Sequence, residues 1–172
     1  MTDGLNQLET HLATSHSLRE QTYANIEDMQ DWARWLRRSR EPDVVIGTNY
    51  LLRWHVIPRN PWQNVYLHEF RRSDDDRALH DHPWDNTTFV IEGEYREHTE
   101  FGRVYHRQAG ETVSRTAETL HRIELIDGRP AVSLFMTGPK IREWGFDCGA
   151  KGWRHWTEFT TAHGNEVGKG CE

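Results

Sequence analysis

The sequence predicts an all-β fold, a barrel or a sandwich, with one amphipathic helix in front of it. In most of the chain, short runs of β-branched and aromatic residues recur with turn residues between them. The pair Asp127-Gly128 separates two alternating apolar runs, which is a strong hairpin signal. The beginning of the chain differs, because its apolar residues recur at helical spacing. We therefore divide the chain into an N-terminal helical segment (1–43), a β-barrel (44–160) and a flexible tail (161–172).

An apolar stripe marks the helix. The stripe repeats every three or four residues, and charged residues fill the other faces. Arginines near the end suit the helix dipole, and Glu41-Pro42 ends the helix. We expect this helix to cover one opening or edge of the barrel, and a helix that binds a partner is the alternative. The stripe consists of Ile26, Met29, Ala33 and Leu36.

Short strand-like runs follow the helix, and turn signals separate them. Residues 58–61 form a turn between the first two runs, and the charged residues 71–77 form a loop after the second. Runs of this length and spacing indicate a barrel or sandwich rather than an α/β fold. The runs are 50–57, 65–70, 87–91, 95–100, 103–107, 112–114, 121–126 and 131–137.

Composition and charge exclude several classes of protein. At 172 residues, the chain suits one domain with a real core. A net charge of −6 argues against a general nucleic-acid binder, and no segment approaches the roughly 20 apolar residues that span a bilayer. The first residues lack a secretory signal. The only cysteines are Cys148 and Cys171, the second in a Gly-rich end, so we expect no structural disulfide and a cytoplasmic protein.

Three histidines form the candidate metal site. His80 and His82 lie one residue apart at what reads as the start of a strand through Thr87 and Phe89, so their side chains point to the same side of the sheet. Asp81 would point away. His121 begins another strand, and three histidines converging from two strands would form a facial site for a divalent ion. Imidazoles inside a barrel would otherwise need hydrogen-bond partners, which favours ligation.

The spacing of these histidines resembles that of the cupins, a superfamily of small β-barrels with two short histidine motifs on antiparallel strands. The first cupin motif has the form G-x5-H-x-H-x3,4-E-x6-G, and His80, His82 and Gly93 match it. The second has the form G-x5-P-x-G-x2-H-x3-N, and Gly110 and His121 match it. The resemblance implies a cupin-type double-stranded β-helix, or jelly roll, and a homodimer.

The chain departs from the cupin motifs at the metal-binding glutamate, where it has Asn86. Either three histidines hold the metal, as in the thiol dioxygenase branch of the family, or an oxygen ligand comes from Asp85, Asn86 or another carboxylate. We favour three histidines and water. The run His-Asp-His-Pro-Trp also resembles a run in uncharacterised cupins of bacteria and phages, and this narrower resemblance implies no known reaction. The other departures are Asp74, Thr116, Glu118 and Leu125.

This resemblance and the missing glutamate together suggest a function. Three neutral imidazoles leave an ion with positive charge and open positions, which suits Fe(II) beside dioxygen. We therefore expect an Fe(II) dioxygenase acting on a small polar or anionic molecule. A metal-dependent isomerase, epimerase or lyase is one alternative, for which Mn, Ni or Zn would serve. A cupin that binds a small molecule without catalysis is the other.

Two further residues are candidates for a catalytic role. We expect His68, on a neighbouring strand, to be an ordinary half-buried histidine, and a hydrogen-bond donor behind the metal ligands or a proton shuttle is the alternative. Arg142 would bind a substrate carboxylate or phosphate with its planar guanidinium group. Neither residue belongs to a motif.

Overall fold

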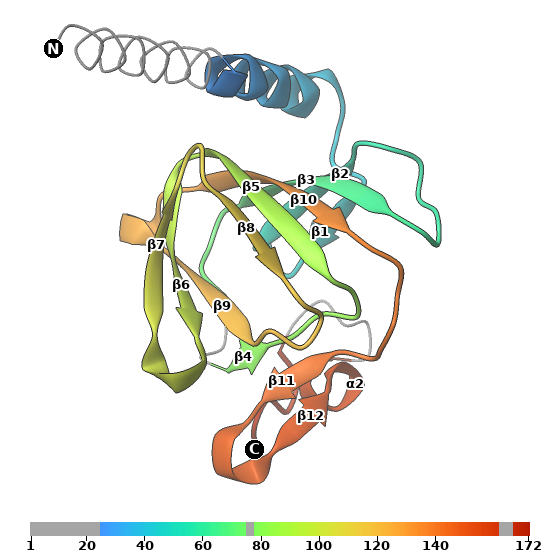
Figure 1. The fold of residues 1–172 in the computed structure, drawn as a ribbon, viewed down its shortest axis with the longest axis vertical. Coiled ribbons are helices and arrows are strands. Elements are labelled where there is room, and N and C mark those ends of the chain that lie inside the picture. Colours follow the sequence, from blue (N-terminus) through green and yellow to red (C-terminus); the bar gives the residue numbers. More distant parts are fainter. Residues whose placement is uncertain (1–24, 75–77, 162–166) are drawn as a thin grey trace, which may run out of the picture.

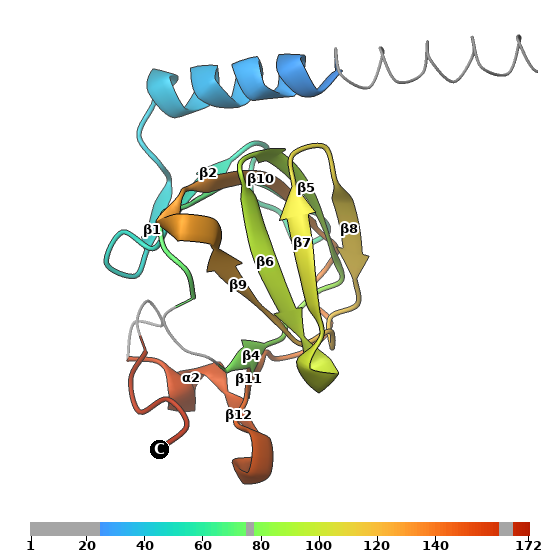
Figure 2. The same ribbon diagram turned by 90° about the vertical axis from the view of Figure 1, so that its left-hand side faces the viewer.

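The computed structural model describes residues 25–74, 78–161 and 167–172. In this part of the chain, two six-stranded antiparallel sheets face each other, and a helix of residues 25–39 lies outside one of them (Figure 1). The view turned by 90° shows this helix running over the end of the molecule opposite the C-terminal segment (Figure 2). Residues 1–24 of the expected helical segment lie outside the described residues.

The first sheet has the order β1-β2-β3-β10-β5-β8, and the second has the order β12-β11-β4-β9-β6-β7. Sequence patterns anticipated the longer strands but not the short ones β1, β4, β11 and β12. The strands of the first sheet are β1 (Val44–Ile46), β2 (Leu51–His55), β3 (Asn64–Phe70), β10 (Ala131–Thr137), β5 (Asn86–Glu92) and β8 (Thr112–Arg115). Those of the second are β12 (Trp153–His155), β11 (Gly145–Asp147), β4 (Leu79–His80), β9 (His121–Leu125), β6 (Glu94–Thr99) and β7 (Val104–Gln108).

The strand order defines the fold as a jelly roll. From β3 to β10, every connection crosses to the other sheet except the one between β6 and β7. The central strands therefore form two interleaved sets, β3-β10-β5-β8 and β4-β9-β6-β7. This is the eight-stranded, two-sheet arrangement of jelly rolls, to which the cupins belong. The all-β double-stranded β-helix expected from the sequence is confirmed.

The Asp127-Gly128 turn does not form the expected hairpin. The short 3-10 turn Ile126–Gly128 joins β9 to β10, which lie in different sheets and do not pair. A second crossing, between β5 and β6, requires Gly93. Its φ of +73° is left-handed, and a Cβ there would lie 2.6 Å from the carbonyl oxygen of Pro130. By contrast, the turn Glu100–Gly102 joins the paired strands β6 and β7, as expected.

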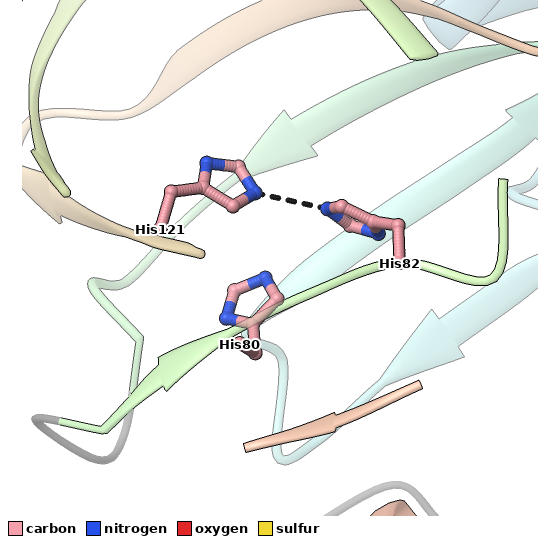
Figure 3. Close-up of side chains that lie close together, drawn as sticks. All are labelled: His80, His82 and His121. Atoms are coloured by element: carbon pink, nitrogen blue, oxygen red, sulfur yellow. Dashed lines mark hydrogen bonds between the residues drawn. The ribbon is translucent and has the colours of Figure 1, made fainter. Parts of the chain in front are cut away.

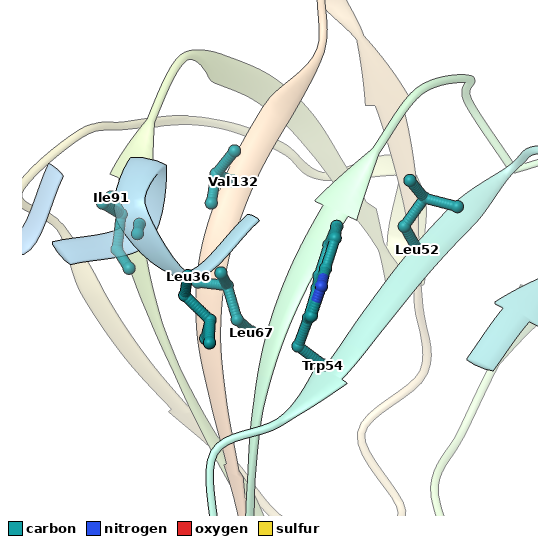
Figure 4. Close-up of a cluster of buried hydrophobic side chains, with 7 residues drawn as sticks. Leu36, Leu52, Trp54, Leu67, Ile91 and Val132 are labelled. Atoms are coloured by element: carbon teal, nitrogen blue, oxygen red, sulfur yellow. The ribbon is translucent and has the colours of Figure 1, made fainter. Parts of the chain in front are cut away.

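The helix of residues 25–39 packs on the outer face of the first sheet, not on an opening or edge as expected. Ala33 and Leu36 contact outward side chains of the sheet, including Leu67, which is fully buried (Figure 4). Alternation along each strand sends one side chain to the helix and the next to the barrel interior. Arg37 also links the helix to two sheet carboxylates, at 3.1 Å from Glu69 and 2.6 Å from Glu92.

A second apolar cluster lies between the two sheets. Phe70 and Val90 of the first sheet meet Tyr95, Ile123 and Leu125 of the second. These residues alternate with outward-facing ones along their strands, as Ile123 and Leu125 do on β9. The cluster fills one part of the barrel interior. The histidines lie in another part of the same interior.

The C-terminal segment differs most from expectation. A disulfide joins Cys148 to Cys171. Residues 167–172, part of the expected flexible tail, are held further by Arg154, whose guanidinium donates to the carbonyl of Gly170 at 2.9 Å. The sequence predicted a flexible tail because this segment is rich in glycine. At Gly168, however, glycine is needed for close packing, since a Cβ would lie 2.6 Å from the carbonyl oxygen of Thr160.

The disulfide removes one ground for the expected location. Disulfides are uncommon in a reducing cytoplasm, so cysteine usage no longer argues for that compartment. Residues 162–166 of the tail lie outside the described residues. The last helix, α2 (Trp156–Phe159), and the 3-10 turn Gly149–Lys151 complete this segment. No helix in the described ranges is both long enough and apolar enough to span a membrane.

Candidate metal centre

His80, His82 and His121 converge inside the barrel (Figure 3). One nitrogen from each ring lies within 4.8 Å of the corresponding nitrogens of the other two. Strand pairing explains two of the three positions, because His80 on β4 stands directly opposite His121 on β9. His82 follows two residues later. The structure therefore brings together the three residues that the sequence indicated.

His82 reaches the group by a different route from the one expected. The strand of His80 ends at that residue, and the next strand, β5, belongs to the other sheet and begins at Asn86. His82 therefore lies in the connection between the sheets, where its backbone N–H donates to the carbonyl of Ala117 at 3.0 Å. The expectation that His80 and His82 share a strand with Thr87 is wrong. Their side chains still point into the same group because Asp81, the residue between them, holds the connection in place.

Asp81 holds this connection in place. Its carboxylate points away from the histidines, as expected, and is 2% exposed. It accepts hydrogen bonds from the backbone N–H of Gly145 at 2.7 Å and from Nε1 of Trp153 at 2.9 Å. Arg142 pairs with the same carboxylate at 2.6 Å and donates to the carbonyl of Ala117 at 3.2 Å. In this structure Arg142 therefore orients the His80–His82 segment, and its binding of a substrate anion stays a prediction.

Glu97 on β6 lies behind His121, and sequence reasoning missed it. The carboxylate is 1% exposed, and the Nδ1–H of His121 donates to it at 2.9 Å. Arg107 and Arg115 also donate to it, at 2.8 and 2.6 Å. Burial alone would raise the pKa of Glu97, but the hydrogen bond from His121 and the charge of Arg115 outweigh it and lower the pKa to about 2. Glu97 is therefore an anion that can only accept.

This acceptor fixes the proton of His121. Because Glu97 takes the Nδ1–H, the Nε2 atom of the neutral ring carries a lone pair that faces the other histidines. Metal-binding histidines commonly have this carboxylate partner on the nitrogen that does not bind the metal. The only sequence signal for Glu97 is its place in β6, where it alternates with Arg96 and shares the inward face with the buried Tyr95.

The separation of two of the rings fits a shared ion. The Nε2 atoms of His82 and His121 are 2.9 Å apart and share a hydrogen bond, in which His82 donates because the proton of His121 lies on Nδ1 (Figure 3). Two nitrogens that each lie about 2.0–2.1 Å from one ion, at right angles to each other, are also about 2.9 Å apart. Burial lowers the pKa of His80 to about 4 and that of His82 well below its ordinary value, so both rings are neutral at pH 7. Neutral imidazole is the form that binds metals.

Asp85 is not among the residues that group with the three histidines, and a role for Asn86 as an oxygen ligand stays a prediction. Asp85 accepts a hydrogen bond from the backbone N–H of Ala117 at 2.8 Å, which braces the segment before His121. Asn86 is 4% exposed, and neither its amide nitrogen nor its amide oxygen has a partner among the described residues. The described residues thus supply three imidazole donors to this group and no carboxylate.

His68 lies in the same interior without a hydrogen bond to the three histidines. Its ring stacks between Tyr66 and Phe135, at centroid distances of 5.8 and 5.1 Å. Its Nε2 accepts a hydrogen bond from Nε of Arg53 at 2.9 Å, and burial holds its pKa well below the ordinary value. The ring of Phe135 in turn lies 5.6 Å from that of His82. A role for His68 as a proton shuttle stays a prediction.

Solved structures that are similar to this chain share little sequence with it. No family model matches the chain, and no curated protein matches its sequence. Among solved structures, a double-stranded β-helix protein of Klebsiella pneumoniae is 21% identical, with a TM-score of 0.48, over 58% of this chain and 86% of that one. The KdgF protein of a Halomonas species is 16% identical, with a TM-score of 0.47, over 60% of this chain and 90% of that one.

A third structure is a cupin superfamily protein of Desulfitobacterium hafniense. It is 14% identical, with a TM-score of 0.45, over 58% of this chain and 81% of that one. Identities and scores this low carry no argument about function. The assignment of the cupin-type fold therefore rests on the strand order described above.

Proposed function

We propose that this chain is a metal-dependent enzyme whose ion is held by His80, His82 and His121, and that with Fe(II) it is an oxygenase for a small polar or anionic molecule. One observation carries the proposal. The Nε2 atoms of His82 and His121 face each other at 2.9 Å, while Glu97 occupies the opposite nitrogen of His121. That arrangement leaves a lone pair of His121 in the middle of the group.

The protein's own residues prepare this site. Glu97 keeps a proton on Nδ1 of His121, and burial keeps His80 and His82 neutral, so neither of these two rings repels a cation. The rings of Phe146 and Phe135 lie 5.8 and 5.6 Å from those of His80 and His82 and limit the access of water. These contacts orient the imidazoles before any ligand arrives.

The choice of iron follows from the donor set. Three neutral donors without a carboxylate leave positive charge and open positions, and a bound Fe(II) would supply one-electron chemistry with dioxygen. Asn86, at the place of the glutamate in the cupin motif, adds no negative charge. An ion such as Zn or Mn in the same site would support an isomerase or lyase, so oxygen dependence separates the two classes.

Oxygen uptake tests the proposal. Protein loaded with Fe(II) under anaerobic conditions is transferred to an oxygen electrode and offered a panel of small thiols, carboxylic acids and sugars. We expect uptake coupled to product formation, its loss in His121→Ala, and its retention in His106→Ala. His106 is an exposed histidine paired with Glu94 and serves as the matched control. Product formation that proceeds equally without oxygen would contradict the oxygenase and favour an isomerase or lyase.

A further inference from the structure

Arg53 differs from Arg107, Arg115 and Arg142 because no described carboxylate pairs with it. Burying a guanidinium group is costly unless an anion compensates for the lost water. Arg115 and Arg107 pair with Glu97, and Arg142 pairs with Asp81. For Arg53, on β2, no described carboxylate forms an ion pair. The Nε–H of Arg53 donates a hydrogen bond to His68, and the guanidinium lies 4.7 Å from the centroid of the Tyr66 ring.

The surroundings of Arg53 favour an anion. Burial lowers the pKa of Arg53, so its guanidinium is poorly solvated. It remains charged at any physiological pH. Because Nε is engaged by His68, the two terminal nitrogens are the free part of the group, and no described residue accepts from them. Two parallel N–H groups of this kind bind both oxygens of a carboxylate.

A second polar group without a partner, Ser133, lies in one row with Arg53 and His68 across three neighbouring strands of the first sheet. Arg53 and Ser133 are the direct neighbours of His68 on the two adjacent strands, β2 and β10. The hydroxyl of Ser133 is buried, at 1% residue exposure, and has no hydrogen-bond partner among the described residues. Buried polar groups in proteins are nearly always paired, so the unpaired hydroxyl of Ser133, with Arg53 on the other side of His68, points to a polar ligand.

This row lies beside the histidine group. The ring of His68 is 5.1 Å from that of Phe135, which is 5.6 Å from that of His82. A small molecule bound to Arg53 at one end would therefore extend past Phe135 toward the three histidines. Arg53 is partly exposed, and its terminal nitrogens are not among the fully buried atoms without a partner, so a ligand can reach them.

We propose that Arg53 binds the carboxylate of a small substrate, with Ser133 as a second hydrogen-bonding group, and that it sets the substrate class of the three-histidine site. As an assignment of substrate class, this inference rests on the metal-enzyme function proposed above. Binding of a carboxylate by Arg53 does not itself need a metal, so the two proposals fail separately.

Titration of metal-free protein with propionate tests the inference. Backbone amide signals around His68 are followed by NMR in every variant, together with the Nε–H signal of Arg53 in the wild type. The buffer contains no carboxylates, and propionamide and inorganic phosphate are titrated in parallel. We expect a saturable shift with propionate and none with propionamide, which has the same shape but no charge. Arg53→Gln should weaken propionate binding about tenfold or more. Arg53→Lys keeps the charge but loses the two parallel N–H donors, so its affinity for propionate should lie between those of the wild type and Arg53→Gln.

Arg103→Gln is the matched control. The side chain of Arg103 is exposed, lies over the face of Phe101 and pairs with no described carboxylate. Its propionate binding should equal that of the wild type. Equal binding of propionate and propionamide, or no binding of propionate by the wild type, would overturn the inference. Binding of phosphate in place of propionate would overturn the carboxylate class. If Arg53→Gln does not fold, the wild-type comparison of the acid with its amide still decides.

Discussion

At the scale of single residues, the site depends on one carboxylate that no cupin motif contains. Glu97 accepts from His121, Arg107 and Arg115 and stays ionised because its pKa is about 2. A neutral amide at this position would accept more weakly and would not hold the Nδ1 proton of His121 as firmly. The imidazole would then lose both orientation and basicity.

We therefore expect Glu97→Gln to weaken metal binding by about 10–100-fold. Competition with a chelator, using zinc as the probe, measures the affinity. Thermal unfolding of the metal-free protein is followed in parallel, because the substitution also leaves Arg115 buried without its carboxylate. Glu124→Gln, which removes an exposed partner of Arg96 on the neighbouring strand, should leave the affinity unchanged. A folded Glu97→Gln variant that binds zinc as tightly as the wild type would contradict this role.

At the scale of elements, ion pairs fasten the N-terminal helix to the first sheet. Arg37 lies between Glu69 and Glu92, and both carboxylates come from the sheet. Burial alone would raise the pKa of Glu69, but hydrogen bonds from Arg71 and Arg37 outweigh it and hold the pKa below the ordinary 4.5. A lowered folded-state pKa means that Glu69 stabilises the fold above pH 4.5 and that this contribution disappears as the pH falls through the folded value.

We expect Glu69→Gln to lower the free energy of unfolding by about 1–3 kcal/mol at pH 7, because charged hydrogen bonds are lost. At a pH below the folded pKa of Glu69, the variant and the wild type should be equally stable. Denaturant unfolding at the two pH values measures this difference. Glu27→Gln, which removes the same charge from an exposed helix position, should have no effect at either pH. A stability difference that is the same at both pH values would show that the charge of Glu69 is not the cause.

At the scale of the whole molecule, alternation of apolar residues predicted most of the fold. Runs such as 131–137 read as strands because side chains on the two faces meet the helix and the interior in turn. Sheet membership could not be read in this way. The Asp127-Gly128 turn looks like a hairpin turn, but it carries the chain between sheets, and only the packing of the whole barrel decides which strands pair.

The site could be predicted only in part, because strand pairing brings together residues that are far apart in the sequence. The spacing of His80, His82 and His121 follows a motif, whereas Glu97 reaches His121 through strand pairing across residues far apart in sequence. The disulfide between Cys148 and Cys171 was missed because two cysteines that are 23 residues apart give no sign that a Gly-rich tail folds back. The unpaired state of Arg53 likewise becomes visible only when every neighbouring carboxylate has been placed.

The most direct measurement of the central claim is the metal content of the protein purified without a histidine tag or chelator. Elemental analysis of the wild type is run beside His82→Ala and the matched control His106→Ala, before and after anaerobic addition of Fe(II). We predict about one divalent ion per chain in the wild type and in His106→Ala, and its loss in His82→Ala. A wild type that binds no ion even after Fe(II) addition, or a His82→Ala variant that keeps a full complement, would contradict the metal centre.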